Sequence, residues 1–146
     1  VDAETFRRVR ENFSADSVDN ATCLATIREV LDAHDYLLDP HTAVAYAAAQ
    51  NLRGENPVLI ASTAHWAKFG NNVYRAIHGI EPSGELPADV AALTGCELNK
   101  LIAEETDKHH IPAGLANLYT MQLRFTEVID NDVEAIEDAA EAFLTR

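Results

Sequence analysis

Residues 57–69, PVLIASTAHWAKF, constrain the fold more than any other stretch of this 146-residue chain. Residues 57–61 form a short apolar run with two β-branched side chains, which predicts a buried strand. Phe69, Val73 and Ile77 then recur at four-residue spacing, which predicts an amphipathic helix. A strand that leads directly into a helix places the polar residues between them at its carboxyl end, where open α/β sheets bind their ligands.

The polar residues of this turn are Ser62, Thr63 and His65, and Lys68 lies just inside the predicted helix. Hydroxyl groups at such a place can contact a ligand, and the free N–H groups of the helix start can bind an anion. The alternative is that Ser62 and Thr63 only cap the helix, which is a common use of these residues. The residues alone leave both interpretations open.

Composition limits the partners of the chain. Its length fits one domain with a real core. The formal net charge of −13 disfavours nucleic acid and anionic membranes as partners. Two cysteines, Cys23 and Cys96, give neither a disulfide framework nor a metal-binding spacing. Because the sequence shows no signal peptide and no apolar run long enough to cross a bilayer, we expect a soluble cytoplasmic protein.

Further helices in the N-terminal half are predicted from their first residues. Asp2 can cap a first helix, and Asp19 or Asn20 can cap a second. Asp39 followed by Pro40 predicts a third, because a carboxylate suits the N-cap and proline suits the first helical position. The small residues that follow permit close approach to another backbone or to a flat ligand.

The C-terminal half contains two similar segments, residues 86–95 and 111–120, and each predicts a short helix after a proline. Between them, residues 96–108 predict a charged helix that ends at His109 and His110. Histidines are favourable near a helix C-terminus. A metal site needs more ligands at a workable spacing, so we expect none there.

These patterns predict a helix-rich α/β fold. Strands are expected at residues 58–61 and 125–129, and a last helix follows the second strand. We divide the chain into a motif-bearing α/β part, residues 1–79, and a helical part with a short strand, residues 80–146. One central strand cannot form an independent sheet, so the sheet is expected to be incomplete in this chain.

Two motifs carry a resemblance to a known family. Residues 36–45, YLLDPHTAVA, followed by residues 62–69, STAHWAKF, resemble the C-terminal third of threonine synthase. The resemblance reaches upstream through residues 24–29, LATIRE, and it weakens beyond Gly79. One departure is Trp66, where the family usually has proline.

The resemblance implies a pyridoxal-phosphate-dependent lyase of fold type II. Such an enzyme converts O-phospho-L-homoserine and water to L-threonine and phosphate. The family's Schiff-base lysine and its phosphate-binding segments belong to an N-terminal part that this chain lacks. The resemblance therefore implies that residues 1–146 are a single C-terminal segment, that its partner is the missing N-terminal part of the same polypeptide, and that the isolated chain is inactive.

The resemblance also assigns roles to residues of the turn. The hydroxyl at the position of Thr63 contacts the pyridine nitrogen of the cofactor, and Ser62 is the second candidate for this contact. A neutral hydroxyl tempers the electron-sink character that a carboxylate would strengthen. His65, Lys68 and His41 are weaker candidates, which would lie behind the contacting residues or near a phosphate.

Two other functions remain open. A catalytically silent helical binding or assembly module would also suit an acidic chain with an incomplete sheet. A metal hydrolase built on His41 and His65 is a more distant hypothesis. We also expect the isolated chain to self-associate, because unpaired strand edges and uncovered apolar surfaces favour aggregation.

Overall fold

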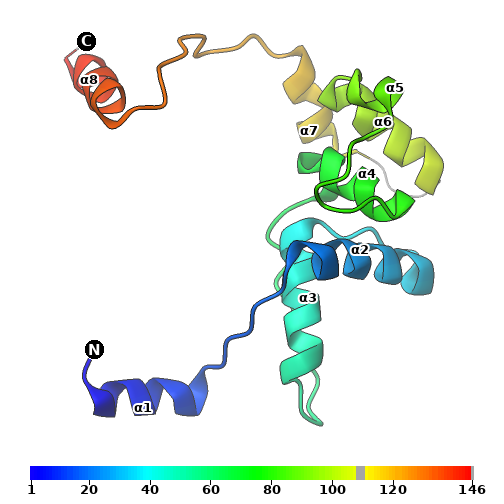
Figure 1. Cartoon of the computed structure of the whole chain (residues 1–146), viewed down its shortest axis with the longest axis vertical. Helices are drawn as coiled ribbons and strands as arrows, with labels where there is room; N and C mark the ends of the chain where they lie inside the picture. Colours follow the sequence, from blue (N-terminus) through cyan, green and yellow to red (C-terminus); the bar gives the residue numbers. More distant parts are fainter. Residues whose placement is uncertain (108–110, 146) are drawn as a thin grey trace.

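The computed structural model describes residues 1–107 and 111–145. Helices are the regular structure of this part of the chain (Figure 1). The α-helices and the 3-10 helices (η) are α1 Ala3–Asn12, α2 Asn20–His34, α3 Pro40–Leu52, η1 Trp66–Lys68, α4 Gly70–His78, α5 Ala88–Ala91, α6 Gly95–Thr106, α7 Ala113–Ala116, η2 Asn117–Thr120 and α8 Val133–Leu144. Within the described residues, none of these helices has the length and apolar character needed to cross a bilayer.

Carboxylate and hydroxyl side chains begin the longer helices. Asp2, Asp19, Asp39 and Asp132 each accept a hydrogen bond from a backbone N–H in the first turn of α1, α2, α3 and α8. Thr94 begins α6 with a reciprocal capping box. Each cap pairs an N–H that the helix itself leaves unpaired, so the helix starts predicted at Asp2, Asp19 and Asp39 are confirmed.

The core lies where α2 packs against α3 and α4, and where α4 packs against α6. Ile27 of α2, Val73 of α4 and Ile102 of α6 are fully buried. The apolar spacing that predicted α4 is thus the spacing of its buried face. Burying one such aliphatic side chain contributes about 1.5–3 kcal/mol.

The two predicted strands do not form in the structure. Residues 58–61 and 125–129 lie outside helices and strands, and the structure assigns no strand anywhere in the part that it describes. The side chains of Leu59 and Val128 are 98% and 94% exposed, so the prediction of a buried strand at residues 57–61 is also wrong. Both segments have the apolar composition of strands, but a strand forms only when a neighbouring strand pairs with its backbone groups.

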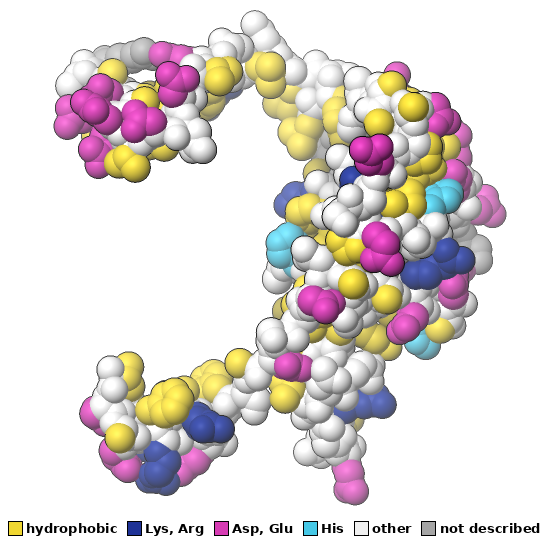
Figure 2. Space-filling model, in the orientation of Figure 1, with side chains coloured by type: hydrophobic (Ala, Val, Ile, Leu, Met, Phe, Trp, Pro, Cys, Tyr) yellow, Lys and Arg dark blue, Asp and Glu magenta, His cyan; other side chains and the backbone are white. Residues whose placement is uncertain are grey.

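The first and last helices lie away from the core. In Figure 1, α1 and α8 stand at the ends of extended segments that leave the body formed by α2 to α7. Neither helix has a buried residue, and apolar side chains such as Phe13 and Phe143 are exposed. Figure 2 shows hydrophobic side chains on the surface of α1 and many acidic ones around α8. Apolar helix faces without a covering partner mark an interaction surface.

The repeated segments of the C-terminal half form short helices, as predicted. α5 follows Pro87 and α7 follows Pro112, and each proline is the N-cap. The charged helix between them, α6, ends at Thr106. The predicted helix end at His109 and His110 lies outside the described residues.

We expect Asp39→Ala to lower the free energy of unfolding by about 1–2 kcal/mol, the usual loss for an N-cap. Asp39 caps α3, which packs on the core, whereas Asp2 caps α1, which has no buried residue. Asp2→Ala is therefore the matched control, and it should leave the urea midpoint of the body unchanged. Unfolding is followed by circular dichroism. Equal losses of stability in the two variants would contradict this assignment.

The contribution of Asp39 should also depend on pH. Burial raises the pKa of Asp39, but hydrogen bonds from the Thr42 hydroxyl and from the N–H groups of Thr42 and His41 outweigh it and lower the pKa. A group with a lowered folded pKa adds stability above its unfolded pKa, about 3.9 for aspartate, and loses it as the pH falls through the folded pKa. The stability difference between the parent and Asp39→Asn should therefore be constant at neutral pH and change only in acid below that value. A difference that does not vary with pH contradicts the assignment.

Candidate functional site

The two sequence motifs meet at a hydrogen bond between hydroxyl groups. Thr42 lies in the first turn of α3, and Ser62 lies in the segment that leads to η1. Their Oγ atoms are 3.0 Å apart although the residues are 20 positions apart in the sequence. This contact places the start of α3 beside the turn of residues 62–69, which we call the motif turn.

A buried carboxylate lies behind this contact. The side chain of Asp39 is only 1% exposed. One oxygen accepts the N–H groups of His41 at 2.9 Å and Thr42 at 3.3 Å, and the other accepts the hydroxyl of Thr42. Burial opposes the charged form, but these bonds and the nearby His41 lower the pKa of Asp39 overall. The carboxylate is therefore ionised at neutral pH and can only accept hydrogen bonds.

The charge on Asp39 fixes the direction of the hydrogen bonds that follow. The single hydroxyl proton of Thr42 is donated to Asp39, so Thr42 can only accept from Ser62. Ser62 must then donate its own proton across the 3.0 Å contact. Its other contact, 3.5 Å to the carbonyl oxygen of Ala64, is also a donation. Ser62 can therefore offer a ligand its lone pairs but not a proton.

Thr63 differs from its neighbour. Its side chain is exposed, and its hydroxyl makes no hydrogen bond within the part of the chain that the structure describes. The interpretation of Ser62 and Thr63 as helix caps is wrong, because His65 caps η1 and α4 begins without a side-chain cap. Thr63 is thus a hydrogen-bond donor that the protein leaves available.

His65 and Lys68 occupy different surroundings. His65 is half-buried, and its Nδ1 accepts the N–H of Ala67 at 3.2 Å. A neutral His65 ring therefore carries its proton on Nε2. Lys68 is exposed at the end of η1. The sequence had predicted that it lies just inside the following helix, and this prediction is wrong, because α4 begins at Gly70. His65 thus shapes the motif turn, and Lys68 presents an exposed cation beside it.

His41 comes close to the far end of the motif turn. Its ring centroid lies 4.8 Å from that of Phe69, and the rings are tilted by 50°. Its Nδ1 is also 3.4 Å from the carboxylate of Asp39. Aromatic rings at this distance attract one another, so the pair forms a second link between α3 and the motif turn.

Trp66 stands where the resemblance implies a proline, and the structure accommodates it. It is the first residue of η1 and is 3% exposed. The N–H group of a first helical residue makes no bond within the helix, so proline and tryptophan meet the same backbone requirement there. The bulky ring packs into the core instead of disturbing the turn.

Sequence reasoning missed the roles of Thr42 and Phe69. The sequence presents Thr42 only within the motif of residues 36–45, and Phe69 only as part of an apolar stripe. The position of Thr42, three residues after a capping aspartate, is a local signal for its bond to Asp39. Nothing local predicts its bond to Ser62, because the two residues come together only when the chain folds.

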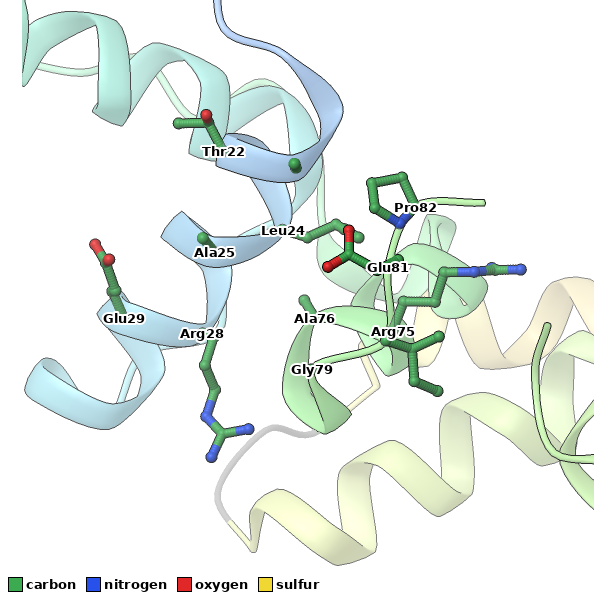
Figure 3. Close-up of a pocket in the computed structure, with 12 residues that line it drawn as sticks. Thr22, Leu24, Ala25, Arg28, Glu29, Arg75, Ala76, Gly79, Glu81 and Pro82 are labelled. Atoms are coloured by element: carbon green, nitrogen blue, oxygen red, sulfur yellow. The ribbon is translucent and has the colours of Figure 1, made fainter. Parts of the chain in front are cut away.

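A separate hollow of about 550 Å³ lies between α2 and the end of α4. Figure 3 shows Arg28 and Glu29 projecting from α2, with Arg75 and Glu81 on the opposite side. Arg28 donates to the carbonyl oxygen of Ile77 and to Asp32, so its charge supports the C-terminal end of α4. None of the predicted site residues lines this hollow.

The metal-hydrolase hypothesis gains no support. Residues 1–107 and 111–145 contain no group of three or more His, Cys, Asp or Glu side chains placed to hold a metal ion. His41 contacts Phe69, whereas His65 binds the backbone of the motif turn. The expectation about a metal at His109 and His110 concerns residues that the structure does not describe.

Comparison with known proteins gives a consistent result. The family model for the C-terminal part of threonine synthase matches residues 42–139, so the similarity continues well past Gly79. Threonine synthase-like 1 from Mus musculus is 42% identical over 71 residues, which are 48% of this chain and 10% of that protein. Threonine synthase from Pseudomonas aeruginosa is 35% identical over 95 residues, which are 64% of this chain and 20% of that enzyme.

A solved structure is also similar. The PLP-bound threonine synthase from Brucella melitensis matches with a TM-score of 0.61 and 27% identity. The match covers 97% of this chain and 25% of the Brucella chain. This chain thus spans a quarter or less of these relatives, and the family match covers α3 from Thr42 onward and the whole motif turn. The chain belongs to the threonine synthase family, and the region of that family that it matches is the C-terminal one.

Proposed function

We propose that this chain is the C-terminal part of a pyridoxal-phosphate-dependent threonine synthase. The whole enzyme would have fold type II and would convert O-phospho-L-homoserine and water to L-threonine and phosphate. Family membership supports the reaction, and the bound PLP named for the Brucella melitensis structure supports the cofactor. Two free cysteines suit the reducing cytoplasm in which we place the enzyme.

The observation that carries the proposal is the unequal use of the two neighbouring hydroxyls. The proton of Ser62 is used inside the protein, because ionised Asp39 orients Thr42 and Thr42 orients Ser62. The proton of Thr63 is available. An unprotonated pyridine nitrogen can only accept a hydrogen bond, so Thr63 is the residue of the pair that fits it.

The residues present fit this cofactor in a second respect. The carboxylate that is linked to Ser62 through Thr42, that of Asp39, is buried and already accepts three hydrogen bonds. It therefore does not compete with Thr63 as the partner of the ring nitrogen. Bound PLP acts as an electron sink for carbanion chemistry, and a neutral partner moderates that property. Thr63 would hold the ring in place without favouring a protonated, positively charged ring nitrogen.

Ser62 would then have a positioning role. Its bond to Thr42 fixes the start of the motif turn on α3, and the contact of His41 with Phe69 fixes the end. Lys68 is exposed and cationic, so it is suited to an anionic group of a ligand but not to replacing the Schiff-base lysine. We therefore expect the isolated chain to be inactive.

The exposed helices suggest the partner of the chain. α1 and α8 present uncovered apolar side chains, and this chain corresponds to 25% of the Brucella enzyme. We propose that the remainder of the same polypeptide covers these faces. A silent binding or assembly module is the second candidate, and it is favoured by the same exposed faces.

We expect Thr63→Val to weaken cofactor binding in the full-length enzyme by about fivefold to tenfold, the usual effect of one lost hydrogen bond. Valine keeps the volume and β-branching of threonine, so the melting temperature should stay close to that of the parent. Thr63→Ser is the matched control, because it keeps the donor. The measurement is a fluorescence titration with PLP, combined with turnover to threonine.

The same titration distinguishes Thr63 from Ser62. Ser62→Ala should affect cofactor affinity less than Thr63→Val, because Ser62 has no proton to donate. If only Ser62→Ala weakens binding, the contact belongs to Ser62. If neither change alters binding or turnover, the proposed role of the motif turn is refuted and the binding-module candidate gains support.

We expect the isolated chain to self-associate through its exposed apolar faces. Replacing Phe6 and Phe13 of the α1 region by serine should reduce the average mass measured by light scattering, because both side chains are exposed. Thr5→Ser is the control and should leave the mass unchanged. A monomer at high concentration in the unmodified chain would contradict the expectation.

A further inference from the structure

Asn99 of α6 is a buried polar residue whose contacts extend beyond its own helix. It is 2% exposed and lies next to the core residue Leu98. Its Nδ2 donates to the carbonyl oxygen of Ala67 at 2.7 Å and to the hydroxyl of Tyr119 at 2.9 Å. Because the carbonyl of Ala67 can only accept, this bond also determines which way the amide group faces.

The other end of the amide lies against Gly70. Oδ1 of Asn99 is buried and has no hydrogen-bond donor among residues 1–107 and 111–145. A Cβ atom placed on Gly70 would lie 2.7 Å from this oxygen, which is too close for any side chain. The φ angle of Gly70 is not positive, so the backbone itself would accept alanine. The side-chain oxygen of Asn99 is therefore the nearest obstacle to a side chain at residue 70, the first residue of α4.

We propose that Asn99 is a positioning residue for the motif turn, a role that rests on the proposed function of Thr63. Its amide holds Ala67 on one side and the start of α4 on the other. The N–H group of Ala67 in turn donates to His65. The turn that carries Ser62 and Thr63 is thus held by α3 at its beginning and by α6 at its end.

Packing alone does not account for this arrangement. A buried oxygen without a donor costs free energy, and such groups are rare in folded proteins. An apolar side chain of similar size would avoid that cost but would leave the carbonyl of Ala67 unpaired. The contacts of Asn99 reach η1, the start of α4 and η2. They fix the relative positions of these elements rather than filling space.

Trp66, the single tryptophan of the chain, allows a direct test. It is buried and adjacent to Ala67, so its fluorescence reports on the position of the turn without any cofactor. In this chain, Asn99→Asp and Gly70→Ala should each move the emission to longer wavelength and increase quenching by acrylamide. The helical circular dichroism should remain. Gly114→Ala is the matched control, because a Cβ there meets nothing within 4 Å.

A double substitution tests whether Asn99 and Gly70 act on each other. Asn99→Ala removes the oxygen with which a side chain at position 70 collides, so Gly70→Ala should change the Trp66 signal strongly in the parent and little in the Asn99→Ala background. Equal effects in both backgrounds, or an unchanged Trp66 signal in the single variants, would overturn the proposal.

The link to function is measured separately in the full-length enzyme. Asn99→Asp should weaken PLP binding by about tenfold at a temperature where the protein is fully folded, because leaving the carbonyl of Ala67 without its donor displaces the turn. If Asn99→Asp only lowers the melting temperature and binds PLP as the parent does, Asn99 has a structural role and the proposed positioning role is overturned. If Thr63→Val has no effect while the Trp66 results hold, the proposed function fails, but the positioning of the motif turn by Asn99 stands.

Discussion

The buried charge of Asp39 determines how the two motifs are joined. An ionised carboxylate in the interior must be surrounded by donors, and the first turn of α3 supplies three of them. Using the Thr42 hydroxyl in this way leaves that oxygen able to accept only. The direction of the next hydrogen bond, which Ser62 donates to Thr42, follows from this. A helix cap thereby decides which of two neighbouring hydroxyls can donate to a ligand.

Sequence patterns predicted the features that depend on neighbouring residues. The helix starts at Asp19 and Asp39 are local, because the capping side chain and its N–H partner are two or three residues apart. The predicted strands failed for the opposite reason, since pairing requires a neighbour from elsewhere. Residues 58–61 have the composition of a strand, but the described part of the chain offers them no strand to pair with.

The candidate site was predictable only in part. Its hydroxyls were identified through the resemblance of residues 62–69 to a known family, and family membership is confirmed. The bond between Ser62 and Thr42 and the contact of Asn99 with Ala67 join residues 20 and 32 positions apart. Such contacts depend on how α3 and α6 pack, and no spacing in the sequence encodes that.

The arrangement of the core has a consequence for folding kinetics. α2 packs on α3, which follows it directly in the chain, whereas its packing on α4 joins residues such as Arg28 and Ile77 that are 49 positions apart. Proteins with mainly local contacts fold quickly, because little loop-closure entropy is lost before contacts form. The pair of α2 and α3 can therefore form early. α1 and α8 have no buried residue. Their docking would therefore be a late step that depends on the protein surface that covers their apolar faces.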